Sequence, residues 1–219
     1  MNSILKSAAM AAALALLVCT PACTKAKPDG KSRNTFLLTC TLCDGIKGDN
    51  AKLYLYYPDY GNLCLLDSAS SDRGVFSFSG SLENPQVAML TFGGCGIAMK
   101  FVLQPGDIGL RIYKHRIVFV GGEQNMAYAD FLNKRNSAMQ SHIDLWQKYA
   151  AAVADSTLTQ KTDKAMASQD STLQDSIQNM IVLGINKNEA YSLIIKDRYL
   201  NDLDSTHLSR LTATTTKRP

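Results

Sequence analysis

The hydrophobic residues of this 219-residue chain change their spacing once, at Gly121-Gly122, and this change constrains the fold more than any other feature. Before the two glycines, short apolar or alternating runs are separated by turn residues. After them, apolar residues recur at spacings of three, four and seven, and glycine is absent until Gly184. Alternation is typical of half-buried strands, and the longer spacing is typical of amphipathic helices. The sequence therefore predicts an α+β fold, with strands over residues 35–122 and helices over residues 123–211.

Eight runs before the glycine pair are predicted strands, and together they favour an antiparallel β-sandwich, with a barrel as the alternative. In the run Val75–Gly80 the two phenylalanines share one face and the serines the other, so one face is expected to be core. The turns Asp72–Gly74 and Pro105–Asp107 are expected to join hairpin strands, because glycine allows positive φ and proline presets the first turn residue. The eight runs are Thr35–Cys43, Lys52–Tyr57, Leu63–Ala69, Val75–Gly80, Gln86–Phe92, Met99–Leu103, Ile108–Tyr113 and Arg116–Val120.

The second half of the chain predicts an antiparallel helical hairpin followed by a shorter third helix. Asn125 is the expected start cap of the first helix, and Asp155-Ser156 is expected to end it and to cap the second. The predicted apolar stripes are Phe131, Leu132, Met139, Ile143, Trp146, Tyr149 and Val153 in the first helix and Leu158, Ala165, Leu173, Ile177, Met180 and Ile181 in the second. The third helix runs from about Asn188 to Leu200, Ser205 caps a short fourth turn, and residues 212–219 form a polar tail.

The N-terminus has the pattern of a bacterial lipoprotein signal. Lys6 precedes the apolar stretch Ala8–Val18, which is too short for the roughly 20 residues that cross a bilayer. Cys23 follows a small residue just after this stretch, so residues 1–22 are the predicted signal peptide and Cys23 is the predicted acylated residue. The alternative is simple secretion, in which Cys23 is an ordinary signal-peptide cysteine. Residues 23–34 form a predicted flexible tether, and the expected location is the Gram-negative envelope, membrane-anchored and facing the periplasm.

Charge and composition exclude several classes of protein. The chain is 46% hydrophobic and 19% charged, which is typical of a folded globular protein. Its 23 Lys and Arg against 19 Asp and Glu leave a net charge of only +4, and the basic residues are scattered. No nucleic-acid partner is therefore expected. The expected partners are the membrane, through the acyl chains, and an envelope protein or small ligand that the sequence does not identify.

The pair Cys40 and Cys43 forms a Cys-x-x-Cys motif inside a predicted strand. Residues three apart in an extended strand point to opposite faces and lie about 10 Å apart, beyond the roughly 6.8 Å limit on Cα separation for a disulfide. The pair can close only if the strand has ended by Leu42, and the turn residues that follow Cys43 leave that geometry open. The preferred interpretation is that Cys40 is a core residue.

Two more cysteines, Cys64 and Cys95, complete four candidate redox or disulfide cysteines, with three full pairings open. They stand alone, without the second close ligand pair that a zinc site needs, so no metal and no cofactor are predicted. The three histidines, His115, His142 and His207, lack any accompanying catalytic motif, and no catalytic residue is predicted. Lys114-His115-Arg116 is a candidate contact for an anionic partner or lipid headgroup, although a solvated hairpin tip is the simpler interpretation.

Several turn and strand motifs carry a resemblance to a known family. They are Asp67–Ala69 followed by Asp72–Gly80, then Glu83–Pro85, Phe101–Ile108, and Gly121-Gly122 with Asn125. Over about Phe36–Leu211 the chain resembles the N-terminal domain of unknown function (DUF4369-type) that precedes the thioredoxin domain in envelope lipoproteins of the TlpA-like and AhpC/TSA group. That thioredoxin domain would begin about where this chain stops. The resemblance thus implies a fold and an envelope setting and does not transfer oxidoreductase activity.

The sequence is compatible with three classes of function. The favoured one is a non-enzymatic, lipid-anchored module that binds an envelope partner or ligand. The second is an accessory to periplasmic thiol-disulfide exchange, which uses its own cysteines or assists a thioredoxin-like partner. The third, an enzyme of another type, has no supporting constellation of residues.

Overall fold

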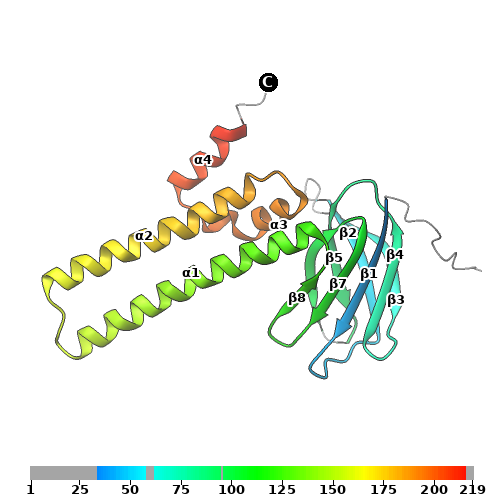
Figure 1. Ribbon diagram of the computed structural model, residues 1–219, viewed down its shortest axis with the longest axis horizontal. Coiled ribbons are helices and arrows are strands. Elements are labelled where there is room, and N and C mark those ends of the chain that lie inside the picture. The colour runs from blue at the N-terminus through cyan, green and yellow to red at the C-terminus, as the bar shows by residue number, and fades with distance from the viewer. Residues whose placement is uncertain (1–33, 58–61, 95, 216–219) are drawn as a thin grey trace, which may run out of the picture. The chain divides into compact units, whose positions relative to one another are not determined.

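A computed structural model of the chain describes residues 34–57, 62–94 and 96–215, with Tyr57 and residues 212–215 described by backbone only. They form eight strands in two sheets, followed by four α-helices and one short 3-10 helix (Figure 1). The α+β class and the order of strands before helices are confirmed. The predicted signal peptide, Cys23, the tether up to residue 33 and Cys95 lie outside the described residues.

Each predicted strand corresponds to one observed strand, with ends that differ by up to two residues. The strands are β1 (Thr35–Leu42), β2 (Asn50–Tyr57), β3 (Asn62–Ser70), β4 (Val75–Ser81), β5 (Gln86–Phe92), β6 (Ala98–Leu103), β7 (Gly106–Ile112) and β8 (Ile117–Val120). One sheet has the order β4-β1-β7-β8 and the other β3-β2-β5-β6.

The two turns predicted to join hairpin strands instead carry the chain between the sheets, so that expectation is wrong. Asp72–Gly74 connects β3 of one sheet to β4 of the other, and Pro105 with Gly106 connects β6 to β7. The turn chemistry itself is as expected, since Arg73 has a φ of 53° and Gly74 a φ of 82°. The strand β7 lies beside β1 in this other sheet and runs parallel to it. The sandwich is therefore mostly but not wholly antiparallel.

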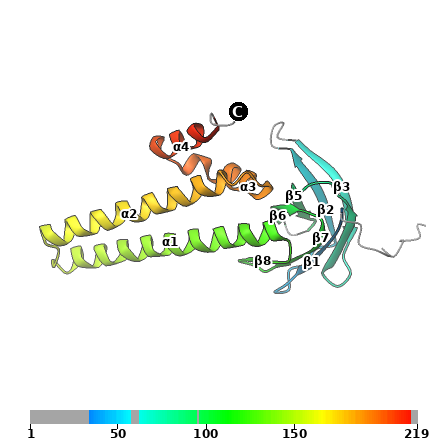
Figure 2. The same cartoon turned by 45° about the horizontal axis from the view of Figure 1, so that its top comes forward.

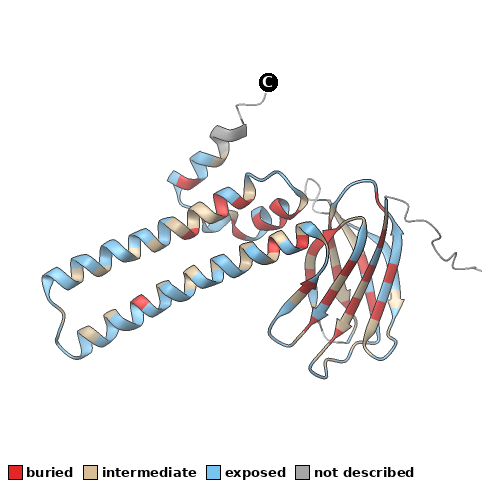
Figure 3. Cartoon of the chain, viewed as in Figure 1, coloured by how far each residue is buried: buried red, intermediate tan, exposed pale blue. Residues whose placement is uncertain are grey.

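The core lies between the two sheets, where alternate residues of each strand are buried (Figure 3). In β1 the buried positions are Phe36, Leu38, Cys40 and Leu42. Phe76 and Phe78 of β4 are also buried, which confirms the assignment of the phenylalanine face to the core. Burial of these side chains is the main favourable contribution to the stability of the sandwich.

The helices form a long antiparallel pair with two shorter helices after it (Figures 1 and 2). They are α1 (Glu123–Ala154), α2 (Gln160–Ile185), α3 (Ala190–Tyr199), the 3-10 helix η1 (Leu200–Asp202) and α4 (Ser205–Thr215). The helix α4 thus continues into the segment that the sequence predicts as a polar tail. Among the described helices, none has the length and apolar character that a membrane span needs.

The predicted caps are partly wrong. Asp155 follows the last residue of α1, as expected, but Ser156 lies in the following turn with a φ of 55°. Thr159 caps α2 instead, because its side chain accepts from the backbone N–H of Thr162, whose hydroxyl in turn accepts from the backbone of Thr159. This reciprocal pair is a capping box formed three residues later than predicted.

The predicted stripe of α1 is also partly wrong. Ile143 and Trp146 are 44% and 51% exposed, and Val153 is 50% exposed, whereas Leu145 is buried. The distal half of α1 packs against α2 (Figure 1), and the residues of α1 on that side include the buried Leu145 and the half-buried His142. The Trp146 indole N–H also reaches α2, where it donates to Asp170 at 3.0 Å. The pattern of apolar residues identifies a helix here but does not decide which side another helix covers.

Asn125 is buried within the first turn of α1 and does not cap it. The residue before the helix is Gly122, with a φ of 75° and no side-chain capping hydrogen bond. The Asn125 carboxamide instead binds the backbone of Val102 in β6, the outermost strand of its sheet. A polar side chain expected at a helix end thus attaches α1 to the sandwich.

A second attachment lies between α3 and the same sheet. Lys100 Nζ of β6 lies 2.6 Å from a carboxylate oxygen of Asp197, and the Tyr56 hydroxyl of β2 donates to the other oxygen at 3.1 Å. The Lys100 ammonium also sits 4.0 Å from the centre of the Tyr56 ring. The hydrogen bond from Lys100 lowers the pKa of Asp197 below its usual range. These contacts hold α3 on the outer face of the sheet.

Candidate ligand-binding clefts

The three candidate cysteines that the structure describes differ in their burial. Cys40 is fully buried in the core, Cys43 is half-buried just after β1, and Cys64 is exposed on β3. All three are free thiols. The burial of Cys40 supports its interpretation as a core residue on the same face as Phe36 and Leu38.

Burial also determines the chemistry open to Cys40. The removal of the side chain from water raises the pKa of its thiol to about 12. Because the thiolate is the nucleophile in thiol-disulfide exchange, a thiol with so high a pKa is a poor attacking group near neutral pH. Within the described segments, no three His, Cys, Asp or Glu side chains gather as metal ligands would.

One concavity, here called the basic cleft, lies between the β7–β8 turn, β6 and α1 and has a volume of about 490 Å³. Its floor is apolar, with Met99, Ile112 and Phe119 from the strands and Leu132 from α1. The three strand residues are buried and so are already part of the packed core. A concave site with an apolar floor is the usual setting for a small ligand.

The rim of the basic cleft carries the charges. Lys114, His115 and Arg116 form the turn between β7 and β8, which closes through a hydrogen bond from the Tyr113 N–H to the Arg116 carbonyl at 2.9 Å. The Arg116 guanidinium lies 4.8 Å from the centre of the Tyr113 ring. All three residues of this turn line the cleft.

The charged side chains that line the cleft are all basic. Among the described residues that line the basic cleft, none is Asp or Glu. Lys100 also lines the cleft, and its ammonium forms an ion pair with Asp197. An Asp44 carboxylate oxygen lies 3.5 Å from the backbone nitrogen of Lys114. In the part of the chain that the structure describes, Lys114 and Arg116 form no ion pair. The cleft is therefore suited to an anionic group at its rim.

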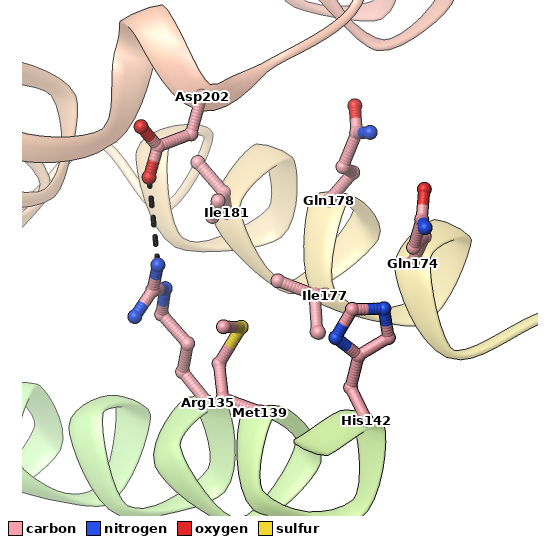
Figure 4. A pocket seen from close by; sticks show the side chains of 8 residues that line it. All are labelled: Arg135, Met139, His142, Gln174, Ile177, Gln178, Ile181 and Asp202. Atoms are coloured by element: carbon pink, nitrogen blue, oxygen red, sulfur yellow. Dashed lines mark hydrogen bonds and ion pairs between the residues drawn. The ribbon is translucent and has the colours of Figure 1, made fainter. Parts of the chain in front are cut away.

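A second, smaller concavity, here called the helical pocket, lies between α1, α2 and η1 and has a volume of about 220 Å³ (Figure 4). Met139 and two isoleucines form its apolar part, and the Arg135 side chain extends from α1 toward Asp202, with 3.4 Å between nitrogen and oxygen. The guanidinium also stacks 4.3 Å from the centre of the Tyr199 ring. Its cation is thus already engaged, which makes the helical pocket the weaker candidate for an anionic ligand.

Only part of the basic cleft can be predicted from the sequence. The basic triplet at 114–116 is contiguous and visible in the sequence. The floor is not, because Met99, Phe119 and Leu132 come from three separate elements that only the fold brings together. The sequence indicates the floor only indirectly, because apolar residues with strand spacing precede Gly121-Gly122 and apolar residues with helical spacing follow it, where the chain turns from β8 into α1.

No curated protein matches the chain. A protein family does match part of it, from the turn after β1 to the first turns of α1, which leaves most of the helical pair outside the matched region. The match confirms the resemblance to a domain of unknown function over this stretch. Residues 44–128 correspond to the family described as Domain of unknown function (DUF4369).

Proposed function

We propose that this chain is a non-enzymatic binding module of the cell envelope, anchored by acyl chains on Cys23 and facing the periplasm, whose ligand carries an anionic group and an apolar portion. The basic cleft supports this proposal: a concavity of about 490 Å³ with an apolar floor and a rim whose Lys114 and Arg116 lack a described acidic partner. The ligand is a small molecule or a segment of an envelope protein of that chemistry.

The two parts of the cleft supply two different contributions to binding. Apolar surface of the ligand that leaves water on the floor contributes about 25 cal/mol for each Å² buried. The anionic group would meet Lys114 and Arg116, and charge-assisted hydrogen bonds to such groups are stronger than neutral ones. The floor would thus set affinity for the apolar portion, while the rim selects for negative charge.

The alternative role, as an accessory to thiol-disulfide exchange, has less support. Cys40 is buried and its pKa is raised to about 12. Cys40 and Cys43 are free thiols that are not bridged to each other. Neither observation provides the exposed, low-pKa cysteine that such exchange requires.

Binding of a fluorescent anionic amphiphile, anilinonaphthalene sulfonate, tests the proposed ligand chemistry. The double variant Lys114→Glu/Arg116→Glu should weaken its binding by about tenfold or more, because the rim becomes acidic. The uncharged analogue N-phenyl naphthylamine should bind both proteins alike. The matched control Lys148→Glu/Lys164→Glu makes the same charge change at exposed positions of α1 and α2, outside the cleft, and should leave binding unchanged.

Equal loss of the anionic probe in both double variants would assign the effect to net charge and would contradict the proposal. So would an anionic probe that binds the Lys114→Glu/Arg116→Glu variant as well as it binds the original chain. The membrane anchor is tested separately: Cys23→Ala should move the protein to the soluble periplasmic fraction, and unchanged membrane association would count against acylation at Cys23.

A further inference from the structure

The strand β3 (Asn62–Ser70) lies at the outer position of its sheet, beside β2 only. Every residue of this strand except Ala69 is exposed. In the part of the chain that the structure describes, no strand pairs with the other side of β3. Its outward backbone N–H and C=O groups are therefore available to another extended strand.

The side chains of β3 do not protect this edge. Leu63 and Leu65 are 43% and 53% exposed, and the register places them opposite Tyr56 and Tyr54 on the outer face of the sheet. Asp67 is the single charged residue of the strand. Natural edge strands usually avoid association through lysines, prolines, bulges or a covering element. Of these devices, β3 shows a shift in register between Leu65 and Asp67, so the regular edge ends at the bulged residue Leu66.

We infer that this edge is a self-association site, where β3 pairs antiparallel with β3 of a second copy of the chain about a two-fold axis beside Cys64. Two identical antiparallel strands are related by a two-fold axis, so the edge that one copy offers is the edge that the other requires. This pairing joins the two four-stranded sheets into one continuous sheet. It is independent of the basic cleft, which lies against the β7–β8 turn, α1 and β6, the strand at the opposite edge of the sheet from β3.

The sequence of β3 selects the register. With the axis at Cys64, Leu63 of each copy lies opposite Leu65 of the other, and the paired residues 62–66 carry no charge. With the axis at Leu65, Leu63 would lie opposite Asp67 of the second copy, which is a less favourable cross-strand pair. The apolar pairs between Leu63 and Leu65 and the end of the regular edge at Leu66 both favour the axis at Cys64.

This register makes Cys64 a direct reporter of the pairing. Directly opposed residues in antiparallel strands have Cα atoms about 4.5–5.5 Å apart, inside the window of roughly 4.4–6.8 Å for a disulfide. Cys64 is an exposed free thiol. Copper phenanthroline in air can accept the two electrons and two protons that a pair of Cys64 thiols releases when one S–S bond forms. The crosslink is a probe of geometry and is not required for the association.

Analytical ultracentrifugation of the purified chain over a range of concentrations tests the association. The original chain should approach twice the monomer mass as concentration rises, and Leu65→Lys should weaken the dimer by about tenfold or more, because it brings two added charges to the shared edge. The matched control is Leu37→Lys, since Leu37 is 45% exposed on β1, whose two edges are both paired within its own sheet. This control should dimerise as the original chain does.

Crosslinking provides the second measurement. Oxidation should yield a covalent dimer that Cys64→Ser abolishes and Cys43→Ser retains. A chain that stays monomeric at all concentrations overturns the inference, as does equal weakening by Leu65→Lys and Leu37→Lys. A dimer whose crosslink survives Cys64→Ser, or that gives no crosslink at all, places the interface elsewhere and also overturns it.

Discussion

Asn125 binds both backbone groups of Val102 through its side-chain carboxamide. The carboxamide oxygen accepts from the Val102 N–H at 2.8 Å, and the nitrogen donates to the Val102 carbonyl at 2.7 Å. Asn125 is fully buried, and so is Val102. The side chain thus satisfies the outer groups of β6 as one residue of a further strand would, and it does so from a helix.

Asn125→Ala should destabilise the fold by about 2–4 kcal/mol, because it leaves the buried N–H and C=O of Val102 without their partner. Urea unfolding followed by circular dichroism measures this free energy. The control Asn133→Ala changes an exposed asparagine of the same helix and should cost less than about 0.5 kcal/mol. Similar free energies for the two variants would contradict the role given to Asn125.

Gly121→Ala should cost more stability than Gly45→Ala, although both glycines have positive φ, at 74° and 70°. At Gly121 an added Cβ would lie 2.7 Å from the Asp107 carbonyl oxygen, whereas at Gly45 nothing lies within 4 Å. Backbone conformation alone costs about 1–2 kcal/mol for an L-residue. The difference between the two unfolding free energies measures the steric clash, and a larger loss in Gly45→Ala would refute the assigned geometry.

Iodoacetamide should label Cys64 rapidly in the native protein and Cys40 only after unfolding. Cys64 is exposed, whereas Cys40 is buried and has a pKa raised to about 12, so little reactive thiolate forms at pH 8. Peptide mapping by mass spectrometry identifies the labelled cysteine at each time and denaturant concentration. Native labelling of Cys40 at the rate of Cys64 would show that the core opens far more readily than its burial implies.

Asp197→Asn should remove part of the loss of stability in acid. The hydrogen bond from Lys100 holds the pKa of Asp197 below its unfolded value, which is about 3.9. The stability it contributes is therefore present above that unfolded pKa and is lost as pH falls through the lower folded value. Both side chains are partly exposed, so the loss near neutral pH should stay below about 1 kcal/mol.

Unfolding free energies measured between pH 7 and pH 2.5 test this prediction. The variant should show a flatter decline below about pH 4 than the original chain. Asp130→Asn is the control, since Asp130 pairs with Lys134 within α1 and both side chains are well exposed. An acid profile of Asp197→Asn that matches the original chain would mean that the pair with Lys100 does not survive in solution.

Much of the sandwich could be predicted because strand patterning is local. The run Gln86–Phe92 coincides with β5, and the alternation of β1 correctly assigned Cys40 to the core. Neither inference needs to know which strand lies next to which. The order of strands in each sheet depends on which strands are neighbours, so it could not be predicted from local patterns. The turn at Pro105, for example, has the same local chemistry whether it joins strands of one sheet or of two.

The helical half was predicted in its elements and not in its contacts. Trp146 and Ile143 follow the helical period, yet Ile143 is 44% exposed and Trp146 is 51% exposed, although the Trp146 indole N–H donates to Asp170 of α2 at 3.0 Å. The same limit applies to Asn125, whose position suits a cap and whose partner is 23 residues away in sequence. For the candidate site, the basic triplet was visible, whereas its apolar floor required tertiary structure.

The parallel pairing of β1 with β7 also determines when the sandwich can be completed. Phe36 lies opposite Gly106 and Leu42 opposite Ile112, so β1 acquires its second neighbour only from a distant part of the chain. The β2–β3 hairpin can form as soon as its own residues are available, but the central pair of the other sheet must wait for Ile112. Long-range strand pairing of this kind slows folding. A chain synthesised from its N-terminus thus leaves one edge of its first strand open until more than half of its length has been made.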